Sequence, residues 1–214
     1  MRFAIFDVDL TLTSKDTFIE FYKFLCKQDK RFLIYFNKVV HAGLMYCLKF
    51  YDEKKSKEQY LSFLNGLSVD VVNEFSKKFF EEHLLKKLLY KDGLLEIEKC
   101  KSKAYKVILI SASPEFYLNN FNQLYSIDYV LGTRYEIKDG FYTGKMLGYN
   151  NKGEEKVLRL YEFLHKNNIE NVDFQNSCMY SDSLNDLPLF NLVGNRFLIN
   201  SKNKVDNIVN LYWK

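Results

Sequence analysis

The sequence predicts an α/β protein: a doubly wound, Rossmann-like parallel sheet with a helical cap inserted after its first strand. Short apolar runs typical of buried strands alternate with stretches whose apolar residues recur at helical spacing. One long stretch, residues 15–89, has helical spacing throughout and only two glycines. With 214 residues, the chain is long enough for a core, residues 1–14 and 90–214, and a cap, residues 15–89.

Buried strands are expected where apolar runs are short and bounded by polar residues or glycine. These runs lie at residues 3–6, 105–111, 127–133, 174–181 and 195–200. The segment YEIKDGFYTGKM alternates around Asp139-Gly140, which predicts a β-hairpin.

Helices are expected between the core strands. They lie at residues 94–103, 152–165 and 183–190. Lys91-Asp92-Gly93 is expected to end the helical block of the cap. Ser113 is expected to cap a further helix that begins at Pro114.

Composition limits the partners that the chain can have. The hydrophobic fraction of 47% and charged fraction of 27% are values of a globular protein. The net charge of +4 comes from scattered lysines, and the densest basic run, KKSK at 54–57, predicts a solvated helix face and no nucleic-acid site. Four widely spaced cysteines without a CxxC pattern indicate reduced thiols in a cytoplasmic protein.

The most membrane-like segment is FLIYFNKVVHAGLMYCLKFY, residues 32–51. Lys38, His41 and Lys49 interrupt it, and its uncharged runs are too short to span a bilayer, so no stable membrane insertion is expected. The N-terminus lacks the pattern of a secretory signal. The segment is interpreted as a helix of the core, with a surface that touches lipid or an apolar substrate as the alternative.

Three polar clusters follow predicted strands. They are Asp7/Asp9/Thr11, Ser111-Ala112-Ser113, and the segment SDSLND at 181–186. On an extended backbone Asp7, Asp9 and Thr11 would project on one side. Each cluster could serve only as a turn or helix cap. In open parallel sheets, however, ligands bind beyond the carboxyl ends of the strands, so three clusters at one edge favour a functional site.

Carboxylates gathered at one place imply a hard cation with oxygen ligands, which fits Mg²⁺ better than zinc. The three histidines lie away from these clusters, and the glycine-rich loops that cradle dinucleotides or nucleoside triphosphates are missing. A carboxylate beside Mg²⁺ can attack phosphorus, because the metal offsets the repulsion between carboxylate and phosphate. The sequence therefore predicts phosphoryl-transfer chemistry.

The order of these motifs resembles the haloacid dehalogenase (HAD) phosphohydrolase superfamily. The resemblance rests on DxDxT, a strand that ends in serine, a lysine near a helix start, and DSxxD. The helical block after the first motif resembles the cap of the phosphoserine-phosphatase-like subclass IB. GEEKV and YSDSLNDLPLF are also similar to that subclass, which includes bacterial phosphatidylglycerophosphate phosphatases.

The resemblance implies a role for each acidic residue. Asp7 would form an aspartyl-phosphate, and Asp9 would protonate the leaving group and then activate water. Mg²⁺ would bind Asp7, the backbone carbonyl of Asp9, and Asp182. Asp186 would support the metal through its water ligands or through Asp182.

The other residues of the motifs would bind phosphate. Ser111 and Ala112 would hold the phosphoryl group, and Thr11 would orient the loop around it. A lysine would balance the developing charge: Lys156 matches the GEEKV form, whereas Lys152 matches the alternative KGE form.

Two residues depart from the pattern of many members of the superfamily. Leu10 and Ser181 stand where glycine is common. Leu10 is expected to affect packing only. Ser181 belongs to the YSDS form, which is familiar in this subclass, and neither substitution removes a catalytic group.

The predicted function is a Mg²⁺-dependent phosphomonoesterase for a small phosphorylated metabolite: an amino-alcohol phosphate, a phosphorylated sugar or an envelope precursor. Asp16 would bind an amino or hydroxyl group of this substrate. The cap segment SKEQYLSFLNGL has no arginine to hold a substrate carboxylate. A lipid phosphate of the phosphatidylglycerophosphate type is an alternative. A phospho-accepting signalling domain is another, which Asp9 disfavours. A monomer or homodimer is expected.

Overall fold

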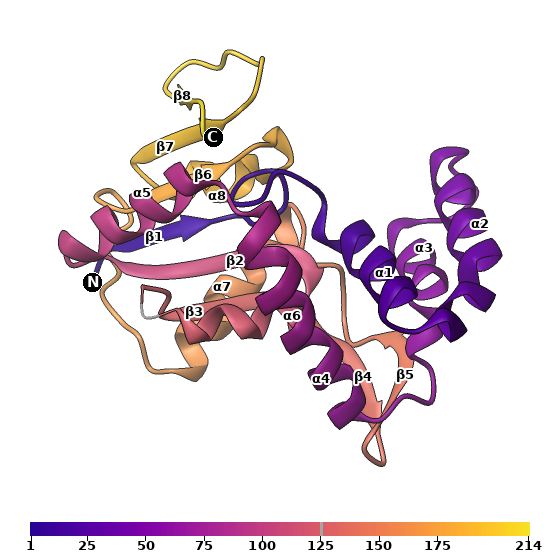
Figure 1. Cartoon of the computed structure of the whole chain (residues 1–214). Coiled ribbons are helices and arrows are strands. Elements are labelled where there is room, and N and C mark those ends of the chain that lie inside the picture. The colour runs from indigo at the N-terminus through magenta and orange to yellow at the C-terminus, as the bar shows by residue number, and fades with distance from the viewer. Residues whose placement is uncertain (125) are drawn as a thin grey trace.

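A six-stranded parallel sheet organises the fold, in the strand order β3-β2-β1-β6-β7-β8 (Figure 1). The computed structural model describes residues 1–124 and 126–214. The strands are β1 Phe3–Phe6, β2 Lys106–Pro114, β3 Tyr129–Thr133, β6 Cys178–Ser181, β7 Asn195–Ile199 and β8 Val209–Leu211. The prediction of a doubly wound α/β fold is confirmed.

The central strand β1 is buried on both faces, which explains its unbroken apolar run. Phe6 belongs to one half of the core, with residues of α5 (Lys91–Ser102) and α6 (Glu115–Leu118). Ile5 belongs to the other half, with residues of α7 (Glu154–Lys166) and α8 (Leu187–Leu192). Successive side chains of a strand point to opposite faces, so both helical layers pack on β1.

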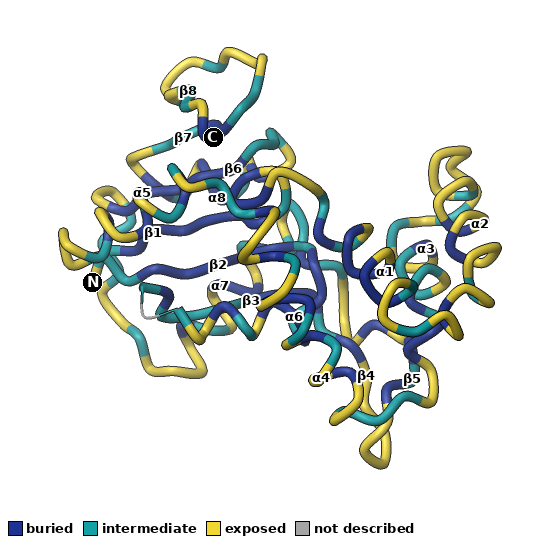
Figure 2. The backbone as a smooth tube through the Cα atoms, in the orientation of Figure 1, coloured by how far each residue is buried: buried dark blue, intermediate teal, exposed yellow. Residues whose placement is uncertain are grey.

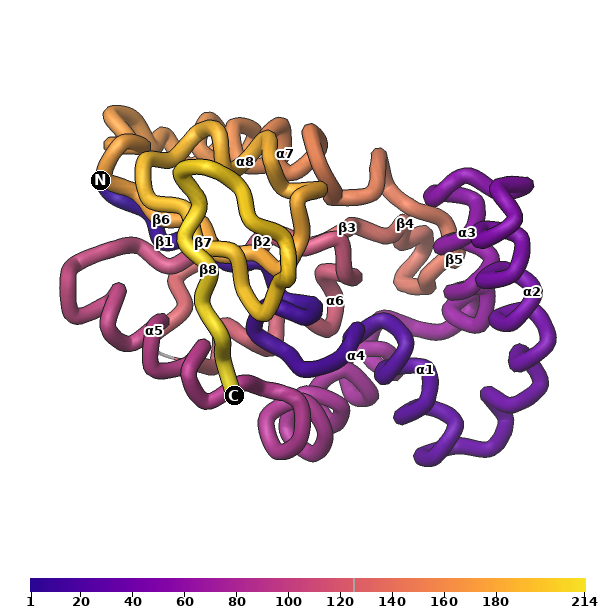
Figure 3. Tube along the Cα trace, turned by 90° about the horizontal axis from the view of Figure 1, so that it is seen from above, coloured from indigo at the N-terminus to yellow at the C-terminus, as the bar shows by residue number. Residues whose placement is uncertain are grey.

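A helical insert lies between β1 and α5. Its segments are α1 Thr17–Gln28, η1 Lys30–Tyr35, α2 Phe36–Cys47, α3 Glu53–Tyr60, η2 Ser62–Leu64, α4 Val69–Lys78 and η3 Phe79–Leu88. The chain enters and leaves the insert side by side, because Thr13 forms an antiparallel bridge with Leu89. Figures 1 and 3 show α1, α2 and α3 beyond the end of the sheet.

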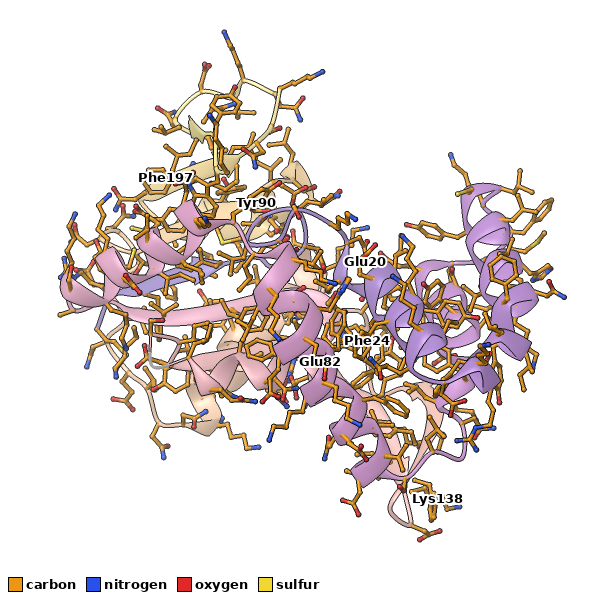
Figure 4. The ribbon with its side chains drawn as sticks, viewed as in Figure 1. Glu20, Phe24, Glu82, Tyr90, Lys138 and Phe197 are labelled. Carbon is orange, nitrogen blue, oxygen red and sulfur yellow. The ribbon has the colours of Figure 1, made fainter. Side chains whose placement is uncertain are left out.

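The hairpin of β4 (Tyr135–Lys138) and β5 (Phe141–Met146) extends from the core to this insert. Asp139 and Gly140 form its turn with φ of 51° and 82°, which confirms the predicted hairpin. Phe141 forms an antiparallel bridge with Ser68 of the insert. Figure 4 labels Lys138 near the tip of the hairpin and Tyr90 where the chain returns to the core.

The predicted break at Lys91-Asp92-Gly93 is misplaced, because the helical insert already ends at Leu88 and the chain is extended at Leu89 and Tyr90. Lys91-Asp92-Gly93 forms the first turn of α5. Gly93 is needed for packing: a Cβ atom there would lie 3.2 Å from the ring of Trp213 and 3.1 Å from Leu12 Cδ2. The contact joins two distant parts of the chain. An interpretation based only on the neighbouring residues therefore takes this glycine for a helix end.

The predicted cap of α6 is also wrong. Strand β2 continues through Pro114, and α6 has no side-chain cap. The expected strand at 174–181 begins only at Cys178, and β8 was not predicted. Strand β8 is three residues long and partly exposed, so it has no buried apolar run to reveal it.

The segment 32–51 is not the core helix that was expected. It forms the end of η1 and all of α2, and only Phe32, Val39 and Ala42 are buried. Figure 2 shows α2 as largely exposed. Within the described residues, no helix combines the length and apolar character needed to cross a membrane.

Candidate active site

The loop after β1 turns sharply. The Asp7 amide still donates to the Tyr180 carbonyl at 2.9 Å, but the amides of Thr11, Leu12 and Thr13 all donate to the Val8 carbonyl. The expectation that Asp7, Asp9 and Thr11 project on one side of an extended strand is therefore wrong. The turn brings each of the three side chains to a different partner.

Leu10 adopts the left-handed conformation in this turn, with φ of 57°. This conformation costs a residue with a Cβ atom about 1–2 kcal/mol and costs glycine almost nothing. The expectation that Leu10 affects only packing is wrong, because the substitution strains the backbone. Its half-exposed side chain also lines the cavity described below.

A buried ion pair network lies at the carboxyl ends of β1 and β6. Lys156 Nζ, near the start of α7, donates to Asp7 Oδ1 at 2.9 Å and to Asp186 Oδ2 at 2.7 Å. Lys156 and Asp186 are each 2% exposed, and Asp7 is 8% exposed. Of the two candidate lysines, Lys156 is the one that contacts Asp7.

Burial determines the electrostatics of this network. Desolvation raises the pKa of Asp7 to about 8; the positive charge of Lys156 opposes this rise, and the negative charges of Asp186 and Asp9 add to it. Burial alone would lower the pKa of Lys156, but the two carboxylates raise it above the ordinary value. Lys156 therefore carries its charge in the closed interior.

The Asp9 carboxylate faces the start of α1. Its Oδ1 accepts from both the amide and the hydroxyl of Thr17 at 2.6 Å, and its Oδ2 accepts from the Ser113 hydroxyl at 2.5 Å. Ser111 Oγ approaches the same oxygen at 3.4 Å. Asp9 thus connects the core to the first helix of the insert.

Ser113 takes part in the site, although within its cluster it was expected only to cap a helix. Its amide donates to Ser111 Oγ at 3.0 Å, and its hydroxyl binds Asp9 instead of capping a helix. Ser111, Ala112 and Ser113 all line the cavity. The alternation of serine and alanine at the end of β2 could have indicated that Ser113 belongs to the site. The proline that follows favoured the interpretation of Ser113 as a helix cap instead.

Thr11 lies beneath the site. It is fully buried, it does not line the cavity, and its Oγ1 accepts from the Asp182 amide at 2.8 Å. The same hydroxyl donates to Asp182 Oδ1 at 3.3 Å. Thr11 therefore positions Asp182. Its side chain is not exposed to a phosphate bound in the cavity.

Asp182 and Asp186 have different surroundings. Asp182 is partly exposed to the cavity, and burial raises its pKa to about 6. Asp186 accepts from Lys156 and, at 2.7 Å, from the Ser181 hydroxyl. The Ser181 hydroxyl thus donates to a buried carboxylate, which a glycine at this position could not do.

Lys152 and Lys57 join the insert to the core. Lys152 Nζ pairs with Glu53 Oε1 of α3 at 2.9 Å, so it does not contact Asp7. Lys57 Nζ of α3 donates to the Ala112 carbonyl at 2.7 Å and to Asn150 Oδ1 at 2.8 Å. The reading of KKSK as a solvated face is therefore wrong for Lys57, whose pKa burial lowers to about 8.

These groups surround one cavity of about 460 Å³. Its core side carries Asp7, Asp9, Lys156, Asp182 and Asp186. Its insert side carries Asp16, Phe18, Ile19, Gly43, Tyr46, Glu53, Ser56, Lys57 and Tyr60. Three motifs that are distant in the sequence thus line one cavity, as expected for motifs that follow neighbouring parallel strands.

Asp16 has a structural contact as well as a place in the cavity. Its Oδ1 accepts from the amides of Phe18 and Ile19, so it is the N-cap of α1. Burial and the nearby charge of Asp9 raise its pKa.

The carboxylates fit a hard cation in their chemistry. Asp7 and Asp182 follow neighbouring strands and both line the cavity, and carboxylate and carbonyl oxygens are the donors that Mg²⁺ takes. Over residues 1–124 and 126–214, no three His, Cys, Asp or Glu side chains are arranged as a ready-made metal cluster. Asp9 explains this in part, because its carboxylate binds Thr17 and Ser113.

Comparisons with known proteins agree with this geometry. The family model "haloacid dehalogenase-like hydrolase" matches residues 4–191. A histidinol-phosphatase of Neisseria meningitidis is 27% identical over 210 residues, which cover 92% of this chain and 89% of that protein. A phosphoserine phosphatase of Mycobacterium tuberculosis is 27% identical over 207 residues, which cover 92% of this chain and 64% of that protein.

Solved structures show the same fold. A Bordetella pertussis protein described as having unknown function has a TM-score of 0.81, with 21% identity and coverage of 94% of this chain and 92% of that chain. A substrate-bound phosphoserine phosphatase has a TM-score of 0.64, with 18% identity and coverage of 97% and 92%. The resemblance inferred from the motifs is thereby confirmed: the chain belongs to the haloacid dehalogenase-like hydrolase family and is a phosphatase, and it is similar to phosphoserine phosphatases in sequence and fold.

Proposed function

We propose that this phosphatase hydrolyses a small phosphomonoester through an aspartyl-phosphate on Asp7, with Mg²⁺ as cofactor. The observation that carries the proposal is the pair of Asp7 and Lys156 at the wall of the cavity, 2.9 Å apart. Lys156 engages Oδ1 of Asp7, which leaves Oδ2 for attack on phosphorus. The ammonium also stabilises the negative charge that develops on the phosphoryl oxygens.

The reaction has two displacements. Asp7 attacks phosphorus, the bond between phosphorus and the ester oxygen breaks, and the Asp9 carboxyl gives its proton to the departing oxygen. Water then attacks the phosphorus of the aspartyl-phosphate, Asp9 takes the proton of that water, and phosphate leaves with the Asp7 carboxylate restored. Thr17 and Ser113 hold Asp9 in place for both proton transfers.

Asp7, Asp182 and the backbone carbonyl of Asp9 would hold the Mg²⁺, with Asp186 behind them. The cation would offset the repulsion between the carboxylates and the incoming phosphate. Burial raises the pKa of Asp7 and of Asp182, which supports the need for a nearby positive charge to keep both ionised. Thr11 fixes the direction of Asp182 through its amide and carboxylate.

We propose that residues 15–89 act as a cap that selects the leaving group, over a catalytic core of residues 1–14 and 90–214. The cap side of the cavity offers a carboxylate, Asp16, and an ammonium, Lys57, beside the aromatic rings of Phe18 and Tyr60. Such a mixed lining suits a polar organic phosphate. The carboxylate of Asp16 could pair with an ammonium group of the substrate, which supports an amino-alcohol phosphate as the first candidate. A phosphorylated sugar or an envelope precursor is the next candidate.

Two observations bear on the alternatives. Two relatives are named for histidinol and phosphoserine, compounds that carry an amino group, which supports the amino-alcohol reading. The aromatic lining of the cap supports a lipid phosphate as the second candidate. A phospho-accepting signalling domain is disfavoured, because Asp9 supplies the acid and base that hydrolysis needs.

Asp7→Asn should abolish turnover of an aryl phosphate, because an amide cannot attack phosphorus. Asp9→Asn should slow hydrolysis while the fold remains. Steady-state kinetics with circular dichroism as a folding check measure both effects, and Asp206→Asn, an exposed aspartate far along the chain, is the matched control. Turnover of Asp7→Asn within threefold of wild type would contradict the mechanism.

Removal of divalent cations by EDTA should abolish activity, and Mg²⁺ should restore it. Ca²⁺ should restore it poorly, since it is larger and less strictly octahedral. Asp182→Asn should raise the Mg²⁺ concentration required for half-maximal activity, whereas Asp206→Asn should not. Full activity of a metal-stripped sample in excess EDTA is the opposing result.

Lys156→Gln should lower kcat about 10²-fold or more, by analogy with loss of one preorganised donor to the transition state. Lys152→Gln should change kcat little, because Lys152 pairs with Glu53 of the cap. Both variants keep a long polar side chain, so the comparison isolates the position of the charge. The reverse ranking would assign the catalytic role to Lys152.

Asp16→Asn separates the two roles of Asp16, because asparagine caps a helix as well as aspartate does but carries no charge. We expect kcat/KM for amino-alcohol phosphates to fall, by an amount that corresponds to an increase of about 1–3 kcal/mol in activation free energy. The kcat/KM for an aryl phosphate should change little. Asp52→Asn, at the N-cap of α3, is the control. Equal losses on both substrates would make Asp16 purely structural.

A further inference from the structure

The cap exposes a set of large apolar side chains on and around α2. We call them the α2 face: Leu33, Ile34, Phe36, Val40, Leu44, Leu48 and Phe50, each between 50% and 80% exposed. Single exposed apolar residues are common on protein surfaces. Seven within 18 consecutive residues form a patch of the kind that marks an interaction surface.

Helical spacing groups the three of these residues that belong to α2 on one side of the helix. Phe36, Val40 and Leu44 follow each other at intervals of four, which aligns them along α2. Val39 and Ala42 lie on another side and are the buried residues of the helix. Helix α2 therefore has one narrow stripe facing the protein and a second apolar stripe facing solvent.

The charged residues within the segment that carries the α2 face have one sign. Residues 30–51 contain four cationic residues, Lys30, Arg31, Lys38 and Lys49, and neither Asp nor Glu. Arg31 pairs with Asp29, which lies just outside this segment. Exposed apolar side chains with flanking lysines are the pattern of a helix that lies in the interface of an anionic membrane.

The position of α2 permits such contact. The helix lies at the end of the molecule farthest from the sheet (Figures 1 and 3). Gly43 and Tyr46 of the same helix line the catalytic cavity. A surface bound to the α2 face would therefore lie next to one wall of that cavity.

We propose that the α2 face docks on the surface of an anionic lipid bilayer. The apolar side chains enter the boundary between headgroups and acyl chains, and Lys38 and Lys49 contact the lipid phosphates. A second copy of the chain fits less well, because a two-fold contact would bring two surfaces of the same positive sign together. The inference does not depend on which phosphate ester the enzyme hydrolyses.

The test is flotation of the full-length protein with phosphatidylcholine vesicles that contain either no anionic lipid or about one third phosphatidylglycerol. We expect binding to the anionic vesicles at low salt and much weaker binding to the neutral ones. Ile34→Asp/Leu44→Asp should abolish binding, and Lys38→Ala/Lys49→Ala should weaken it about tenfold or more. Aryl phosphate turnover should remain at the wild-type level, since none of these four residues lines the cavity.

Matched controls test whether vesicle binding depends on the α2 face itself or on exposed leucines and lysines in general. Leu95→Asp/Leu158→Asp changes two equally exposed leucines on α5 and α7, and Lys202→Ala/Lys204→Ala removes two exposed lysines near β8. Both should bind vesicles as the wild type does. Absence of binding to anionic vesicles, or equal losses in the controls, would overturn the proposal. A dimer in light scattering that Ile34→Asp/Leu44→Asp dissociates, without vesicle binding, would overturn it in favour of a second copy.

Discussion

The buried ammonium of Lys156, held between Asp7 and Asp186, is the interaction on which the site depends. It joins three separate parts of the chain: the end of β1, the start of α7 and the segment after β6. Burying a cation is costly unless it is paired and hydrogen-bonded, and two carboxylates with short contacts meet that need here. Loss of Lys156 would leave two buried carboxylates without a cation, and removal of one member of a buried ion pair in other proteins costs about 3–5 kcal/mol.

The parallel sheet supplies the geometry that this network requires. Strands β1 and β6 are neighbours, so Asp7 and Asp182 follow adjacent strand ends. Strand β2, on the other side of β1, brings Ser111 and Ser113 to the same edge. The insert begins directly after this edge, and its contacts with Asp9 and Ala112 bring cap residues against the core. The proposed chemistry and the proposed selection of the leaving group thus fall on different sides of one cavity.

Much of the core could be predicted because its physical cause is local. Apolar runs such as FAIF mark strands buried on both faces, and polar residues that follow them mark the functional edge. The resemblance of GEEKV to a family pattern favoured Lys156 over Lys152, and the structure places Lys156 against Asp7. These features depend on the sequence within one element and its immediate end.

The remaining features depend on contacts between distant segments. Gly93 was interpreted as a helix end because glycine often ends a helix. Its packing against Trp213, 120 positions away, cannot be inferred from the neighbouring sequence. Lys57 looked solvated because nothing near it in sequence reveals the Ala112 carbonyl that it meets. The apolar residues of α2 looked like core because periodicity reports which side chains share a face, and not whether another element covers that face.

The central claim is that phosphate passes through a covalent bond to Asp7. Borohydride reduction of an acyl phosphate converts aspartate to homoserine, so the enzyme can be mixed with Mg²⁺ and an aryl phosphate, quenched, reduced, digested and read by tandem mass spectrometry. We predict homoserine at position 7, and only in samples that received substrate. Homoserine at position 9, or at no position while the enzyme turns over normally, would contradict the claim.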